Sequence, residues 1–97
     1  MESKYKKELQ SIYKMSLSND PETKDLAINL FWTSEYVKDN EIKPESRLYV
    51  TTYERKGLKL DIGYYIHKDN RSRYGNFSCI LEDLIHDNAY FVKDELK

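Results

Sequence analysis

The chain of 97 residues is poor in cysteine, glycine and proline, and these shortages exclude several kinds of site. Cys79 is the only cysteine, so no intrachain disulfide can form. The three glycines lie far apart, at positions 57, 63 and 75, so no glycine-rich loop is present to hold a phosphate. No serine stands in a nucleophile-elbow context. We therefore expect a non-enzymatic protein with no cofactor and no metal ion.

Long apolar runs and a strong net charge are also missing. No stretch is long enough to span a bilayer, and the charged N-terminal residues do not resemble a signal peptide, so we expect a cytoplasmic protein with no membrane partner. The net charge of −1 argues against bulk electrostatic attraction to nucleic acid. A chain of this length supports one domain, residues 1–97.

Tyrosine is abundant, with nine Tyr against three Phe and one Trp, and it favours half-buried positions and interfaces. Charge is uneven along the chain. Residues 47–76 carry seven Lys or Arg against three Asp or Glu, whereas residues 77–97 carry two Lys against five Asp or Glu. The excess of Lys over Arg, with frequent Asn and Ile, is typical of AT-rich genomes such as those of many bacteria and their phages.

The first 40 residues predict two helices. Residues 2–16 place Tyr5, Leu9, Ile12 and Tyr13 on one stripe of a 3.6-residue period. Asp20-Pro21 then supplies an N-cap and a first-turn proline for a helix that should run to about Lys38. The short connection predicts an antiparallel helical hairpin. The apolar stripe expected on the second helix comprises Leu26, Ala27, Leu30, Phe31 and Val37, with Trp32 and Tyr36 at its margin.

The clearest signal is a β-hairpin over residues 47–67. Apolar residues alternate without a miss at positions 58, 60, 62, 64 and 66, which predicts a strand with one buried face. Arg55-Lys56-Gly57 suits a three-residue turn with Gly57 in the left-handed region. That turn predicts a register with Leu48 opposite Tyr64 and Val50 opposite Ile62. On the other face it pairs Arg47 with Tyr65, Tyr49 with Gly63, and Tyr53 with Lys59.

The C-terminal part predicts a helix from Phe77, for which a strand over Phe77–Leu81 is the alternative. For Ala89–Val92 we favour a short third strand over a helical turn, because an isolated hairpin needs a neighbour. The expected fold class is α+β. An N-terminal antiparallel helical hairpin packs on a small antiparallel sheet, followed by a C-terminal helix and the short third strand.

Two polar clusters are candidates for catalytic chemistry. Cys79, Glu82, Asp83 and His86 lie one and two turns apart on the predicted third helix, but seven residues separate Cys79 from His86, roughly 10 Å along a helix axis. That separation is too great for a direct hydrogen bond, so we interpret the cluster as a solvated acidic face. His67 and Asp69 could form an acid–base pair, although a polar strand end is the simpler interpretation.

The outer face of the hairpin is the better candidate site. Its predicted binding residues combine rings with cations: Arg47, Tyr49, Tyr53, Lys59, Tyr65, Arg71, Arg73 and Tyr74. Tyr and Arg are over-represented at protein-binding hot spots, so the first hypothesis is a protein that binds another protein, as an inhibitor or accessory factor of phage or mobile-element type. The second is a single-stranded nucleic-acid-binding module that uses the same face. An exposed strand edge also predicts a homodimer.

Overall fold

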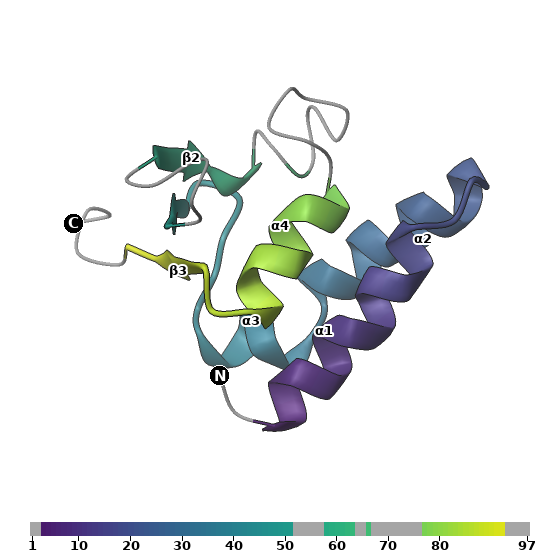
Figure 1. Ribbon diagram of the computed structural model, residues 1–97, viewed down its shortest axis with the longest axis horizontal. Helices are drawn as coiled ribbons and strands as arrows, with labels where there is room; N and C mark the ends of the chain where they lie inside the picture. The colour runs from purple at the N-terminus through teal and green to yellow at the C-terminus, as the bar shows by residue number, and fades with distance from the viewer. Residues whose placement is uncertain (1–2, 52–57, 64–65, 67–76, 93–97) are drawn as a thin grey trace.

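The computed structural model describes residues 3–51, 58–63, 66 and 77–92 and shows an α+β fold, as the sequence predicts (Figure 1). The helices are α1 (Ser3–Ser16), α2 (Pro21–Trp32), α3 (Glu35–Asp39) and α4 (Phe77–Ile85). The strands are β1 (Arg47–Val50), β2 (Leu58–Asp61) and β3 (Ala89–Phe91). The alternative of a strand over Phe77–Leu81 is wrong, and the preference for a strand near Ala89 is confirmed.

Helices α1 and α2 lie side by side, and α4 lies between α1 and the sheet (Figure 1). The start of α2 is as predicted. Pro21 occupies the first turn, and the Asp20 carboxylate accepts a hydrogen bond from the Thr23 backbone N–H at 3.3 Å. On α1 the predicted stripe is confirmed, with Leu9 and Ile12 buried and Tyr5 and Tyr13 packed against the core.

The predicted apolar stripe of α2 is partly wrong. Leu26 is 50% exposed and Leu30 is 39% exposed, whereas Ile28 is buried with Ala27 and Phe31. The sequence offers an apolar side chain in nearly every direction around this helix. The pattern alone therefore does not decide which of these side chains faces α1.

The single helix predicted from Pro21 to about Lys38 is interrupted after Trp32, and α3 begins at Glu35. Ser34 explains the break, because its hydroxyl donates to the Phe31 carbonyl oxygen at 2.6 Å and accepts from the Val37 backbone N–H at 3.2 Å. It thus ends one helix and caps the next. The new direction turns Tyr36 and Val37 into the core, where both are buried.

The sheet is antiparallel with the order β2-β1-β3, so β1 is the central strand. The predicted register is wrong by four residues. Leu48 lies opposite Leu60, and Val50 opposite Leu58. An even shift keeps each side chain on its predicted face, because side chains alternate with a period of two. Leu48 and Val50 are accordingly fully buried, as expected.

The second strand ends at Asp61, not near Ile66. Ile62, Gly63 and Ile66 have helical backbone, and both isoleucines are fully buried. An added Cβ at Gly63 would overlap the Pro44 carbonyl group, so this close backbone approach requires glycine. The predicted alternation fails here because residues four apart share one face of a helical turn as readily as of a strand.

The buried core joins all these elements. Phe31 is fully buried, and its ring meets Trp32, Phe77 and Tyr36 with centroid separations of 5.3, 5.7 and 6.5 Å. Tyr36 also approaches Phe91 of β3, with a centroid separation of 6.1 Å. This run of rings connects α2 with α3, α4 and the inner face of the sheet.

Candidate binding surface

The sheet has an outer face, turned away from the core and built from alternate residues of its three strands. Leu48 and Val50 of β1 are buried, so Arg47 and Tyr49 lie on the opposite side. Residues directly opposite each other across a sheet share a face. The register therefore adds Lys59 and Asp61 from β2, and Tyr90 from β3. The name outer face is used below for these five residues.

Lys59, Tyr49 and Tyr90 form one row across the sheet, with Tyr49 in the middle. The Tyr49 and Tyr90 rings are stacked, with centroids 5.6 Å apart and planes inclined by 17°. The Lys59 Nζ atom lies over the Tyr49 ring, 5.8 Å from its centroid. Such an aromatic pair contributes about 0.5–1.5 kcal/mol beyond its burial, and an exposed cation–π contact about 0.5–1 kcal/mol. These contacts hold the two rings in one orientation before any ligand arrives.

Tyr90 is the more accessible of the two rings in the row. Its side chain is 53% exposed, whereas Tyr49 is half-buried beside it. A large ring that presents apolar surface and a hydroxyl to solvent, on a rigid strand, is the kind of anchor found at protein interfaces.

The second row pairs Arg47 with Asp61, so opposite charges face each other across the two strands. The predicted partners Tyr65 for Arg47 and Gly63 for Tyr49 are therefore wrong, and so is Tyr53 for Lys59. The turn predicted at Arg55-Lys56-Gly57 lies outside the described residues, but the pairing of Val50 with Leu58 contradicts the register derived from it.

Of the eight predicted binding residues, the structure brings together Arg47, Tyr49 and Lys59. The other five, Tyr53, Tyr65, Arg71, Arg73 and Tyr74, lie outside the described residues. Sequence reasoning missed Tyr90, although a signal was present. In Ala89-Tyr90-Phe91 a strand that turns its first and third residues toward the core must turn the middle tyrosine outward.

Comparison with known proteins adds no information about function. No family model, curated protein or solved structure matches the chain. Within the described ranges, no helix combines the length and the apolar character needed to cross a membrane.

The members of the predicted cluster on α4 differ in exposure. Glu82 and His86 are exposed and Cys79 is half-buried, but Asp83 is buried, so the predicted solvated face is wrong at that position. No group of three or more His, Cys, Asp or Glu side chains in the described ranges is arranged to hold a metal ion. Glu82 instead accepts a hydrogen bond from the Tyr13 hydroxyl at 3.1 Å, which raises the pKa of Tyr13. His67 and Asp69 lie outside the described residues.

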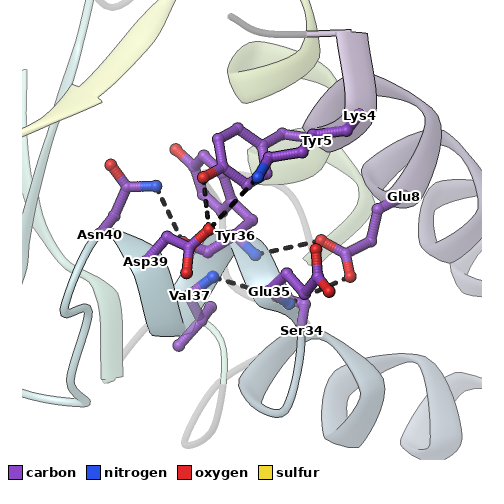
Figure 2. A network of polar contacts seen from close by, with 9 residues as sticks. All are labelled: Lys4, Tyr5, Glu8, Ser34, Glu35, Tyr36, Val37, Asp39 and Asn40. Carbon is purple, nitrogen blue, oxygen red and sulfur yellow. Dashed lines mark hydrogen bonds and ion pairs between the residues drawn. The ribbon is translucent and has the colours of Figure 1, made fainter.

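A network of polar contacts joins α1 and α3 (Figure 2). The two carboxylate oxygens of Glu8 accept hydrogen bonds from the Glu35 and Tyr36 backbone N–H groups, each at 3.1 Å. At the other end of α3, Asp39 accepts from the Tyr5 hydroxyl at 2.5 Å and lies 3.7 Å from Lys4 Nζ. The network holds α3 where Tyr36 packs against Phe91, the neighbour of Tyr90 on β3.

Proposed function

We propose that this chain is a small non-enzymatic protein that acts in the cytoplasm by binding another protein through the outer face of its sheet. Such a protein would serve as an inhibitor or accessory factor, of the type that phages and mobile elements encode. The observation that supports the proposal is the row formed by Lys59, Tyr49 and the exposed Tyr90. Two stacked rings beside a cation provide apolar area at low entropic cost, together with groups that donate hydrogen bonds.

The outer face is not the only exposed apolar surface, and this provides a control. Leu26 and Leu30 on α2 are also exposed, but they are flexible aliphatic side chains on a different part of the fold. Hot spots are enriched in Tyr and depleted in Leu, so the two surfaces predict different results when truncated.

Affinity capture from the native host, followed by quantitative mass spectrometry, tests the proposal. Three baits would be compared: the unaltered chain, a Tyr49→Ala/Tyr90→Ala variant, and a Leu26→Ala/Leu30→Ala variant as the matched control. We expect a protein that the unaltered chain and the leucine variant retain and the tyrosine variant loses. Circular dichroism would establish that all three baits are folded.

Binding measurements on the purified partner then give the magnitude. Tyr90→Ala should weaken binding by at least about 2 kcal/mol, or roughly 30-fold, if Tyr90 is a hot spot. A partner that binds the tyrosine variant as tightly as the unaltered chain would show that the outer face is not the binding surface.

A single-stranded nucleic acid is the second candidate ligand. Stacked tyrosines next to a lysine could take successive bases while the cation meets a phosphate. Against this, Arg47 faces Asp61, so the described part of the face carries little excess positive charge. Fluorescence anisotropy with labelled oligo(dT) decides the question. This candidate requires binding at low salt that weakens steeply as salt is added and is lost in Tyr49→Ala/Tyr90→Ala.

A further inference from the structure

The two edges of the sheet differ in how they are protected against pairing. In β2, the strand at one edge, Lys59 and Asp61 place charges beside the edge, a common device against unwanted strand addition. In β3, the strand at the other edge, residues 89–91 are Ala, Tyr and Phe, with neither charge nor proline. The edge that lacks this protection also carries the exposed Tyr90.

Backbone hydrogen bonds show which groups of β3 point away from β1. The Thr51 N–H donates to the Asn88 carbonyl oxygen at 2.6 Å, and the Val92 N–H donates to the Arg47 carbonyl oxygen at 3.1 Å. Residues 88, 90 and 92 therefore direct their backbone groups to β1, with Tyr90 opposite Tyr49. By alternation, Ala89 and Phe91 direct their N–H and C=O groups to the open edge.

We propose that two copies of the chain pair edge to edge through β3, antiparallel and with the two-fold axis at Tyr90. In this register both outward-directed residues of each strand form hydrogen bonds. Ala89 lies opposite Phe91 of the partner subunit, and Phe91 lies opposite Ala89 of the partner subunit. Four N–H···O bonds form, and a small side chain faces a large one on the inner side. β3 contains no charged residue, so its self-pairing brings no charges together. Self-pairing of β2 would bring together two strands that each carry a lysine and an aspartate.

The dimer doubles the outer face. That this enlarged surface binds another protein rests on the proposed function. The sheet becomes six-stranded, in the order β2-β1-β3-β3-β1-β2. The Tyr49–Tyr90 pair of each copy then meets its counterpart at the axis, giving one row of four tyrosines with a Lys59 at each end. A partner protein with two-fold symmetry, or with two equivalent segments, fits such a face.

The size of the interface sets the expected strength. A stable dimer buries about 800 Å² on each partner, which a pair of three-residue strands does not reach. We therefore expect a weak dimer, with a dissociation constant of roughly 10–100 µM.

Sedimentation equilibrium on the purified chain alone tests the pairing. The apparent mass should rise toward twice the chain mass as concentration increases through the micromolar range. Ala89→Pro removes an outward-directed N–H and leaves the bonds to β1 in place, so it should keep the chain monomeric. Tyr90→Lys should do the same, because two like charges would meet at the axis. A mass that stays monomeric up to about 1 mM, or a dimer that persists in both folded variants, would overturn the proposal.

Disulfide trapping tests the register. Across a non-hydrogen-bonded antiparallel pair the Cα atoms are about 4.5 Å apart, within the range that a disulfide spans. In a Cys79→Ser background, Tyr90→Cys should form a covalent dimer under mild oxidation much faster than Lys59→Cys, which places the thiol at the other edge. Equal rates would overturn the register. These measurements use no partner protein. Dimerisation through β3 and the binding of a partner to the outer face can therefore succeed or fail independently of each other.

Discussion

Among the residues that the structure describes, two that are not glycine have a left-handed backbone conformation, and both follow the end of a helix. Glu41 follows α3 with φ of 54°, and Asp87 follows α4 with φ of 59°. After each, the next backbone N–H reaches back to close the helix: Ile42 to the Val37 carbonyl oxygen at 3.0 Å, and Asn88 to that of Asp83 at 2.7 Å. This is the Schellman arrangement, in which glycine is the preferred residue.

Glu41→Gly should therefore stabilise the fold. Relief of the left-handed backbone contributes about 1–2 kcal/mol, and the greater freedom of glycine in the unfolded chain offsets about 0.5–1 kcal/mol. The free energy of unfolding should rise by about 0.5–1 kcal/mol in urea denaturation. Glu41→Ala is the matched control, because it removes the same side chain without relieving the backbone. An equal gain in the alanine variant would contradict the explanation.

Tyr36 should make the protein sensitive to alkali. Its side chain is only 8% exposed, and burial, with a smaller contribution from Asp87, raises its pKa. The folded state therefore holds this proton more tightly than the unfolded state, whose tyrosine pKa is about 10. The resulting stabilisation is complete below about pH 10 and is lost as the pH rises above it, by up to about 1.4 kcal/mol per pH unit.

Denaturation at several pH values above 10 would measure this loss. In Tyr36→Phe the free energy of unfolding should fall less steeply with pH, by up to the roughly 1.4 kcal/mol per pH unit that one proton contributes. Tyr13→Phe should change it less, because Tyr13 is only half-buried and ionising it costs less hydration than ionising Tyr36. An unchanged alkaline slope in Tyr36→Phe would contradict the assignment.

At the scale of elements, α3 depends on a contact from elsewhere in the chain. It has only five residues, too few to be stable alone, and its first backbone N–H groups bond to Glu8 of α1. Glu8→Ala should cost about 1–2 kcal/mol, as the loss of a helix cap does. Gln10→Ala, an exposed position on the same helix, should change stability by less than about 0.5 kcal/mol.

Hydrogen exchange separates this local effect from a global one. In Glu8→Ala the Glu35 and Tyr36 amides should exchange faster than the rest of the core. Uniform acceleration across all helices would instead show that Glu8 supports the fold as a whole and not α3 in particular.

Some helices and strands could be predicted from local sequence signals, and others could not. Asp20-Pro21 marked the start of α2 because an N-cap and a first-turn proline act within a few residues. The break at Ser34 escaped detection in part because α3 after it is also held by the carboxylate of Glu8, which lies 27 residues before Glu35 in the chain. The hairpin register failed for a similar reason. Its prediction rested on local turn chemistry at Arg55-Lys56-Gly57, whereas the strands pair with Val50 opposite Leu58.

On the scale of the whole molecule, part of the outer face was predicted correctly because a register error of an even number of residues leaves each side chain on the same face of the sheet. Tyr49 and Lys59 were assigned to the correct side although their predicted partners were wrong, since the register shift was even. Tyr90 could not be placed beside them without knowing that β3 pairs with β1, a contact between residues some 40 positions apart. Local patterns thus indicate which way a side chain points, whereas long-range pairing decides what it meets.

The ring cluster around Phe31 holds the whole molecule together, because Phe31 is fully buried and its ring contacts residues of α2, α3 and α4. Phe31→Ala should reduce the free energy of unfolding by about 3–5 kcal/mol, a large share of the 5–15 kcal/mol typical of a domain. Leu30→Ala, one residue away and 39% exposed, should cost less than about 1 kcal/mol. Because Tyr36 of this cluster also contacts Phe91, the loss should reach the sheet, so fluorescence and circular dichroism should report one transition at the same lowered urea concentration. Two separate transitions would show instead that the sheet retains its structure without the helical core.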